Sequence, residues 1–304
     1  MARQSPLAVV RSMVKTHRGL NLALTSNSQD AEINQIIMDT EQWLASEYDW
    51  PFLRSRWDVT VGAGSRYISF PTVDDVGLTA NINFERAGDL QVFVKWNQVW
   101  QDVDYGIREE EEFNYIDSDR NQVLDPIQRW EFDDEMKFEV WPIPASTSTV
   151  RFVGQRCVTD LRAFQTSGTL TSGNTYIIQQ YQTGDNFTNV GGVNTNGSSF
   201  VASGTTPTTW SNGSALLNYP ITWNDSALVD LDDLMTSYFA AAEYSIRQNQ
   251  EQLGQDLLAL GKTRMAMIRA TYPKRSKPPT IVGGGTIFDR RTLRIVPMIV
   301  VGGR

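Results

Sequence analysis

The sequence contains a single cysteine, Cys157, and a single histidine, His17, among its 304 residues. One cysteine excludes an intrachain disulfide and is typical of proteins that assemble in a reducing cytosol. A Cys/His metal cluster is excluded too, because such sites need several of these ligands. A Ser-His-Asp relay would have to use His17, which lies in a basic N-terminal stretch, so we do not expect one.

Long apolar runs are missing as well. No window holds eighteen consecutive apolar residues, so we expect no membrane span. Residues 1–18 are basic but lack the compact apolar core and small-residue cleavage site of a secretory signal. With 40% apolar and 20% charged residues, the composition is that of a folded protein with one large or two modest domains.

Positive charge is scarce outside the last thirty residues. The net charge is −8, but residues 274–304 hold seven basic residues and one acidic residue, which gives that segment +6. The remaining 20 basic and 34 acidic residues leave the rest of the chain at −14. A body this acidic does not bind DNA by counterion release. The basic segment suits either nucleic acid or an acidic protein partner.

The strongest helical pattern lies between Asn224 and Lys274, and it predicts a long C-terminal helix or a tightly joined helix pair. Asp225 is the candidate N-cap and Pro273 ends the pattern. Gly254 is its expected weak point, since an interior Gly costs about 1 kcal/mol against Ala, and the polar run 247–252 is a candidate bend. The apolar positions recur mostly at steps of three and four: Leu228, Leu231, Met235, Tyr238, Ala242, Ile246, Leu253, Leu257, Leu260 and Met267.

A second helical pattern runs from about Gln29 to Tyr48. Ser26 and Ser28 are its candidate caps, and Trp50-Pro51 ends it because a residue before Pro avoids the α region. We expect this helix to pack on the C-terminal one. The expected contact joins the stripe of Ile33, Ile36 and Leu44 to Leu231, Met235 and Tyr238.

Between Trp57 and Phe164 the apolar period changes to two, which indicates an antiparallel β domain. Trp57–Val61 and Tyr67–Phe70 flank a Gly-Ala-Gly turn and predict a β-hairpin. Asn97 tolerates a positive φ and fits a second hairpin turn at residues 96–99. The other predicted strands are residues 82–85, 90–96, 99–103, 129–132, 136–141 and 149–153.

The predicted fold class is α+β, with five parts. An N-terminal arm (1–28) precedes a helical core (29–56 and 222–272) that encloses the central antiparallel β domain (57–164). Residues 165–218 are rich in Thr, Ser, Asn and Gly, have Asp185 as their only charge, and indicate an inserted small β module. After Pro273 the helical pattern is lost, and residues 273–304 read as an extended C-terminal arm.

Few side chains are arranged for chemistry. Four adjacent carboxylates at Glu109–Glu112 point in different directions on a helix, so a charged face is favoured over a cation site. Asp133-Asp134-Glu135 lacks the spacing of a calcium loop. Gly283–Gly285 lacks the following Lys-Ser/Thr of a phosphate loop. Most tryptophans sit where core packing is expected, and only Trp210 and Trp223 are candidates for a sugar-binding platform.

Several segments carry a resemblance when they are taken in order. They are residues 48–54 (Tyr-Asp-Trp-Pro-Phe-Leu-Arg), 67–71 (Tyr-Ile-Ser-Phe-Pro), Phe132, 136–144 (Met-Lys-Phe-Glu-Val-Trp-Pro-Ile-Pro), 150–153 and 226–234. This order resembles the head-to-tail adaptor proteins of short-tailed bacteriophages, which form the ring beneath the portal, and it covers residues 29–164 and 223–272. The insert, residues 174–210, departs from that pattern and resembles a small module that recurs in unrelated phage virion proteins.

The resemblance implies a structural protein without catalytic residues or cofactors. It implies a homo-oligomeric ring, typically of twelve subunits, that sits at the head-tail junction of the virion after assembly in the host cytoplasm. Its implied partners are the portal protein, a tail nozzle or tail tube protein, other copies of the chain and genomic DNA that passes through without sequence-specific binding. No membrane is involved.

The family's extended arm lies on the portal, and the C-terminal composition fits that role. Basic residues would orient the arm on an acidic surface, and apolar residues would be buried in a groove. The expected portal-docking residues are Ile281, Phe288, Arg290, Arg291, Arg294, Ile295, Val296, Met298 and Ile299. The alternative is a tail accessory protein that binds surface glycan through the inserted module, and a glycan-cleaving enzyme ranks last.

Overall fold

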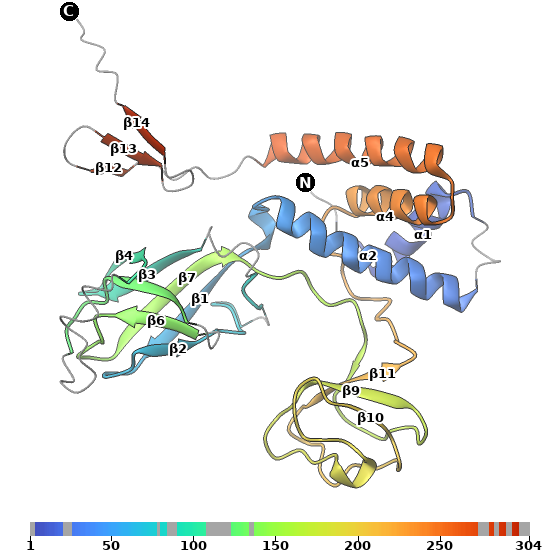
Figure 1. The fold of residues 1–304 in the computed structure, drawn as a ribbon, viewed down its shortest axis with the longest axis horizontal. Coiled ribbons are helices and arrows are strands. Elements are labelled where there is room, and N and C mark those ends of the chain that lie inside the picture. Colours follow the sequence, from blue (N-terminus) through green and yellow to red (C-terminus); the bar gives the residue numbers. More distant parts are fainter. Residues whose placement is uncertain are drawn as a thin grey trace, which may run out of the picture.

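The computed structural model describes residues 4–20, 26–77, 80–83, 90–107, 123–133 and 137–272, together with the backbone of 280–282, 286–289 and 294–297. Within these residues the fold is mixed α+β, as expected. Four α-helices lie beside a seven-stranded, mostly antiparallel sheet, and two smaller sheets complete the chain (Figure 1).

The N-terminal segment is a helix and not an arm. Helix α1, Leu7–His17, buries Leu7, Val10 and Val14 completely. Residues 5 and 7 bond to the segment just before helix α4 (Asp233–Arg247), because Leu7 N donates to Ala227 O (2.8 Å) and Val229 N donates to Ser5 O (3.0 Å). An eleven-residue helix is marginal by itself, so these tertiary contacts decide its formation.

Helix α2, Asn27–Glu47, begins and ends close to where its sequence predicts. Ser26 is the N-cap, and its side chain accepts from Gln29 N while the Gln29 side-chain oxygen accepts from Ser26 N, which makes a capping box. A 3-10 turn, η1 (Pro51–Leu53), follows and leads directly into the first strand.

The C-terminal pattern forms a helix pair, α4 (Asp233–Arg247) and α5 (Glu251–Thr271). Asp232, not Asp225, is the N-cap of α4 and accepts from Met235 N. The chain turns at Asn249, whose φ is +57°, and Gly254 lies inside α5. A Cβ on Gly254 would come within 2.6 Å of the Ile246 side chain, so this Gly permits close packing of the two helices and is not the weak point expected.

The apolar faces of the helices are divided between two clusters. Leu44 shares one cluster with Leu231 and Met235, which confirms this part of the predicted pairing. Ile33 and Ile36 lie in the other, where Tyr238 packs at the edge. Leu231 precedes α4, so its burial depends on the loop and not on helical spacing. The members of the second cluster include Leu7, Val10, Val14, Ile33, Ile36, Ile37, Ala240, Ala241, Tyr244 and Leu257.

The large sheet has the strand order β1-β7-β3-β4-β5-β6-β2. Its strands are β1 (Arg54–Val61), β2 (Tyr67–Ser69), β3 (Gln91–Trp96), β4 (Val99–Tyr105), β5 (Arg129–Asp133), β6 (Lys137–Trp141) and β7 (Ser148–Gln155). All pairs are antiparallel except β4 with β5, which are parallel. Asn97 and Gln98 both have positive φ at the tight β3–β4 turn, where the hairpin was expected.

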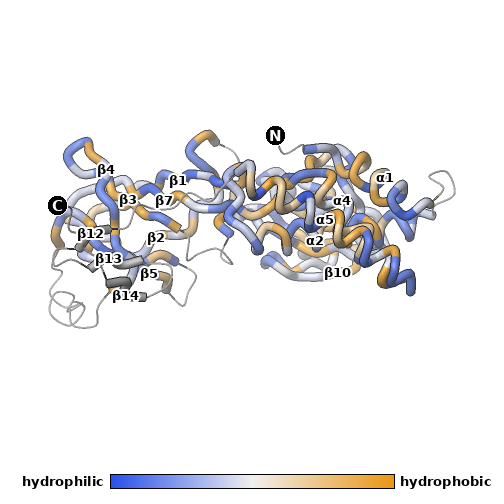
Figure 2. The backbone as a smooth tube through the Cα atoms, turned by 90° about the horizontal axis from the view of Figure 1, so that it is seen from above, coloured by the Kyte–Doolittle hydropathy of each residue, from blue (hydrophilic) through white to orange (hydrophobic). Residues whose placement is uncertain are grey.

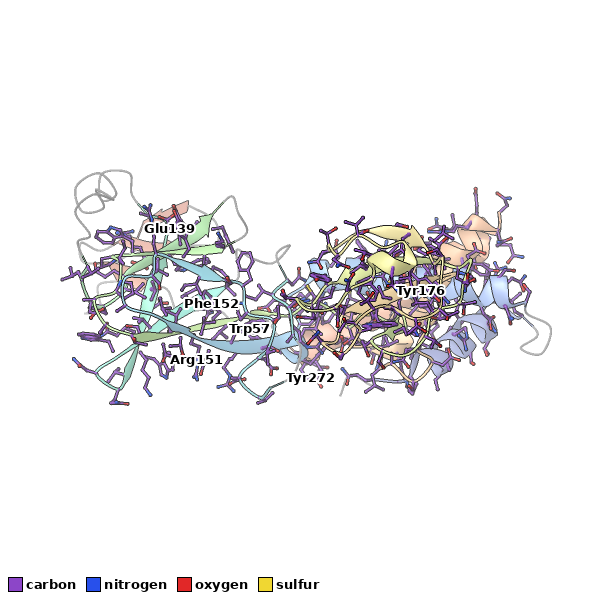
Figure 3. All side chains as sticks on the ribbon, turned by 90° about the horizontal axis from the view of Figure 1, so that it is seen from below. Trp57, Glu139, Arg151, Phe152, Tyr176 and Tyr272 are labelled. Atoms are coloured by element: carbon purple, nitrogen blue, oxygen red, sulfur yellow. The ribbon has the colours of Figure 1, made fainter. Side chains whose placement is uncertain are left out.

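The predicted hairpin of Trp57–Val61 with Tyr67–Phe70 is wrong. Strand β1 pairs with β7 and strand β2 pairs with β6, so the two occupy opposite edges of the sheet. Burial favours this arrangement, because Trp57, Phe138 and Phe152 then share one core, with the Phe138 and Phe152 rings stacked at 4.1 Å. Figure 3 labels Trp57 and Phe152 in this half of the molecule. Local turn signals carry no information about such distant partners.

The inserted segment folds around a core of its own. Its sheet has the order β10-β9-β11-β8, with β8 (Phe164–Gln165), β9 (Thr175–Gln180), β10 (Ser199–Val201) and β11 (Ala215–Tyr219), and a 3-10 turn η3 (Thr188–Val190). Tyr176, Phe187 and Leu216 are buried in it. Residues 156–163 lead into it from β7 and residues 220–232 lead from it to α4, and at this neck Ala163 N donates to Thr222 O (2.8 Å). The module lies apart from the large sheet (Figure 1).

The C-terminal segment is not a single extended arm. Strands β12 (Thr280–Val282), β13 (Thr286–Asp289) and β14 (Arg294–Pro297) pair in order as an antiparallel sheet. Their β-branched residues favour strand pairing over an isolated extended chain. Of the expected docking residues, Arg290, Arg291, Met298 and Ile299 lie outside the described residues, as do Glu109–Glu112 and Gly283–Gly285.

Charged groups join the helices to the large sheet. Arg156, just after β7, donates to both carboxylate oxygens of Asp230 (2.6 and 3.0 Å), and Thr159 N donates to the same carboxylate (2.6 Å). Gln155 of β7 donates to Ala45 O of α2 (2.7 Å) across the same junction. Beside it, Tyr48 donates to Tyr272 O (2.9 Å) and joins the ends of α2 and α5. Figure 3 shows Tyr272 between the two halves.

Glu41 of α2 is fully buried beneath this junction. One carboxyl oxygen accepts from Leu231 N (3.0 Å), and the other has no hydrogen-bond partner. Burial raises the pKa of Glu41 to about 8; the backbone hydrogen bond from Leu231 acts to lower it, and the charge of Asp230 raises it further. Between pH 4.5 and about pH 8 the folded chain therefore holds a proton that the unfolded chain releases, so this group's contribution to the free energy of unfolding falls as pH rises.

Leu231→Ala should lower the free energy of unfolding by about 2–5 kcal/mol, because Leu231 is fully buried with Leu44 and Met235. Denaturant titration measures this loss. Leu228→Ala, at a half-exposed leucine of the same loop, is the control and should change stability by less than about 1 kcal/mol. A loss below about half a kcal/mol for Leu231→Ala would show that this side chain is not packed.

Glu41→Gln should stabilise the protein increasingly as pH rises, because the amide keeps an acceptor for Leu231 N and has no proton to lose. The difference in unfolding free energy between variant and parent should grow by up to about 1.4 kcal/mol per pH unit from about pH 5 to about pH 8, then level off. Urea titrations across that range test this. Glu47→Gln, at an exposed glutamate of the same helix, is the control. A difference that does not vary with pH would contradict the assignment.

Candidate interaction surfaces

Helices α2, α4 and α5 enclose an open, mostly apolar groove of about 560 Å³. Trp43 stands at its edge with 46% of its surface exposed, and its ring meets Phe239 edge-on at 5.4 Å. Ile246 is 43% exposed in the same groove. Exposed Trp and Ile beside a concave surface are the usual anchors of protein contacts. The lining residues are Asp39, Thr40, Trp43, Phe239, Ala242, Glu243, Ile246, Arg247 and Leu258.

Charged residues lie along this groove. Asp39 is exposed and accepts from Gln35 (2.7 Å), one turn earlier on α2. Glu243 pairs with Arg247 one turn later on α4. Such surface pairs contribute little stability and are available to a partner. Sequence patterns assigned Trp43 to the core, since it falls at a helical step, and only the placement of three helices exposes it.

The outer face of α5 is a second apolar surface. Leu260 and Met267, seven residues apart, are 50% and 57% exposed. The sequence assigned both to the buried stripe, which the structure corrects: α5 turns Gly254, Leu257, Gly261 and Ile268 inward. In Figure 2 apolar residues recur along α2, α4 and α5 in the helical half. The face consists of Ala259, Leu260, Thr263, Ala266, Met267 and Ala270, all exposed.

His17 meets a serine, but not in a catalytic arrangement. Its Nε2 lies 3.2 Å from Ser237 Oγ, and its ring packs on Tyr238 at 4.5 Å. Ser237 is fully buried in α4 and donates to Leu234 O (3.0 Å), so no substrate reaches it. Burial lowers the pKa of His17. The pair closes the end of α1 against α4.

The two tryptophans considered for a sugar platform are packing residues. The Trp210 indole N–H donates to Ser214 O (2.8 Å), and its ring meets Phe187 edge-on inside the module. Trp223 is half-buried against the helical cluster. Both indole side chains are partly buried in these contacts.

Asp185, the only acid of the module, organises its last loop. Its carboxylate accepts from the backbone N–H groups of Ser211, Asn212 and Ser214, each at 2.9 Å. Burial acts to raise the pKa of Asp185, but the hydrogen bonds from Ser214 and Asn212 outweigh it and lower the pKa to about 2. These donors all belong to the module itself, so Asp185 stabilises the fold of the module.

No three His, Cys, Asp or Glu side chains converge on a metal-sized space in the part of the chain that the structure describes. In the same part, no helix has the length and apolarity that crossing a bilayer requires. Of the expected docking residues, five lie in strands β12 to β14: Ile281, Phe288, Arg294, Ile295 and Val296.

Comparison with known proteins adds no relative to this geometry. No protein-family model matches the chain, and no curated protein matches it either.

Proposed function

We propose that this chain is a structural head-to-tail adaptor, a non-enzymatic subunit of a ring that sits beneath a phage portal. The ring, of twelve subunits by the family resemblance, joins the portal to a tail nozzle or tail tube protein and continues the DNA channel. The protein acts in the virion, at the head-tail junction, after assembly in the host cytoplasm.

The observation that carries this proposal is the meeting of the adaptor-like segments. Residues 67–69 and 137–139 are neighbouring strands, with Ile68 opposite Phe138. Segments 48–54 and 226–234 contribute Trp50 and Leu231 to one buried cluster. Adaptor-like segments that contact each other in the fold support a framework shared with the adaptor family better than their order in the sequence does.

Charge supports passage of DNA without capture. Outside residues 274–304 the chain carries −14, which disfavours adhesion to a polyanion by counterion release. A channel wall of this sign would repel the duplex at short range. Within the part of the chain that the structure describes, the groove and the outer face of α5 expose apolar residues. Exposed patches of this kind usually mark protein contacts, which favours an assembly over a monomer.

The C-terminal segment is the proposed portal contact. Its basic residues would steer it to an acidic surface, and its apolar residues would gain about 25 cal/mol per Å² buried there. The pairing of β12 to β14 changes the form of this contact from a bare arm to a small sheet carrying basic and apolar residues.

Removing residues 281–304 should abolish binding to purified portal while leaving the helical circular dichroism unchanged, because α5, the last of the four described helices, ends at Thr271. Charge reversal at Arg290, Arg291 and Arg294 should slow association and weaken its salt dependence. Surface plasmon resonance at matched ionic strength measures both, with Arg56→Glu, an exposed arginine on β1, as the control. Undiminished portal binding by the truncated chain would remove this segment from the mechanism.

Deleting the module should leave ring assembly intact, because it has a separate core and a narrow neck. Residues 164–221 are replaced by Gly-Ser-Gly, which joins Ala163 to Thr222 where the two are already hydrogen bonded. Negative-stain images of the variant should show rings of unchanged diameter that still bind portal. A soluble, folded variant that no longer assembles would place the module in the ring contact.

A further inference from the structure

Two turns of the inserted module have the same sequence, Asn-Gly-Ser, at residues 196–198 and 212–214, and they hold the only Asn-Gly pairs in the chain. In an Asn-Gly pair the backbone nitrogen of the glycine can attack the side-chain amide of the asparagine. Glycine favours this reaction because it has no side chain to hinder the approach. Both asparagines and both glycines are exposed, so neither local sequence nor exposure distinguishes the two turns.

Hydrogen bonding of the glycine nitrogen does distinguish them. Gly197 N donates to Ile178 O (2.7 Å), so the nitrogen that would attack Asn196 is held by strand β9. Gly213 N has no hydrogen-bond acceptor in the part of the chain that the structure describes. A nitrogen that must first give up a hydrogen bond of ordinary strength should react about five to ten times more slowly. The fold therefore protects Asn196 and leaves Asn212 open to attack.

We propose that Asn212 is a site of spontaneous deamidation and that the product opens the last loop of the module. Gly213 N bonds to the side-chain carbonyl carbon of Asn212, the bond from that carbon to the side-chain nitrogen breaks, and the proton of Gly213 N leaves with this nitrogen as ammonia. Water then opens the resulting five-membered ring at one of its two carbonyl carbons, which gives aspartate or isoaspartate. No oxidant or cofactor is needed. One added carboxylate takes the formal net charge from −8 to −9.

Aspartate at position 212 does not fit the loop that Asp185 holds. Asn212 Nδ2 donates to Asp185 Oδ1 (3.0 Å), and a carboxylate cannot replace this donor. Although burial acts to raise it, the pKa of Asp185 is lowered to about 2 by its hydrogen bonds, so at neutral pH two carboxylates face each other. A Cβ on Gly184 would lie 2.9 Å from Asn212 Nδ2, so the side chain is packed on that side and the repulsion displaces the loop.

Isoaspartate disturbs the same loop through the backbone, because it adds one carbon to the main chain between residues 212 and 213. The N–H groups of Asn212 and Ser214, on either side of this point, both donate to Asp185 (2.9 Å each). The indole N–H of Trp210 donates to Ser214 O (2.8 Å), so the loop also holds Trp210 in place. Either product therefore frees Trp210.

Peptide mapping of the full chain tests the site. The protein is incubated in mildly alkaline buffer, folded or in guanidinium, and digested with chymotrypsin, because residues 165–218 contain no Lys or Arg for trypsin. Mass spectrometry measures the gain of about 1 Da at each asparagine. In the folded chain Asn212 should deamidate at least about fivefold faster than Asn196. In guanidinium the two rates should agree within about twofold, because the tripeptides are identical.

Two results of this mapping overturn the site. One is a rate at Asn196 that equals or exceeds the rate at Asn212 in the folded chain. The other is no reaction at Asn212 in the folded chain over the time in which the guanidinium sample reacts completely. Asn212→Gln should abolish the reaction at this position, because the longer side chain disfavours ring closure, while Asn196→Gln should leave the rate at Asn212 unchanged.

A pair of aspartate variants tests the opening of the loop. Asn212→Asp should raise native-state chymotrypsin cleavage after Trp210 by at least about tenfold. Asn196→Asp is the matched control and should not, because Asn196 Oδ1 only accepts, from Tyr181 N (2.6 Å), and a carboxylate keeps that acceptor. Unchanged cleavage in Asn212→Asp overturns the loop opening. If Asn212→Asp does not fold, the deamidated fraction of the incubated parent, separated by anion exchange, gives the same measurement.

The deamidation site goes beyond the adaptor function and does not depend on it. Portal binding and ring formation test the adaptor proposal, whereas the two rates of deamidation and the cleavage after Trp210 test this one. The failure of either proposal leaves the other unaffected.

Discussion

The burial of helix α4 is the constraint on which the rest of this structure depends. Ten of its fifteen residues are buried, more than a single apolar stripe requires, so the helix must be covered from several sides. Helices α1, α2 and α5 all pack against it. Ala240, Ala241 and Ala242 let these neighbours approach closely, and Gly254 and Gly261 of α5 do the same from their side.

That burial brings polar groups into the interior, and the N-terminal segment satisfies them. Asp233 accepts from Ser5 (2.6 Å), and Ser237 meets His17. Ser245 donates to Ala241 O within the helix (2.7 Å). Unmade hydrogen bonds at such buried groups cost more than made ones gain, which explains why a short helix far away in sequence belongs to the core.

The junction between the helices and the large sheet also satisfies polar groups by hydrogen bonds, and it buries an acid. Arg156 and Asp230 pair in bidentate geometry and fix the loop that carries Leu231. Holding that loop down buries Glu41, which must keep its proton at neutral pH to lie beside Asp230. These bonds favour one orientation of the helices against the sheet, and a closed ring needs subunits of one shape, since small changes in subunit angle prevent closure.

The sequence by itself determined the local elements: α2 with its Ser26 cap, the α4–α5 pair and the β3–β4 turn, together with the presence of a small β module. Helix propensity, capping and apolar period act over a few neighbouring residues, so the sequence alone indicates the elements that they produce. Tertiary structure alone decided that β1 and β2 occupy opposite edges, that α1 joins the core, and that Trp43, Leu260 and Met267 face outward. The physical reason is that a helical period shows which side chains share an apolar face but not which other element covers that face. Only the packing of several helices determines which apolar residues are covered and which remain for another chain.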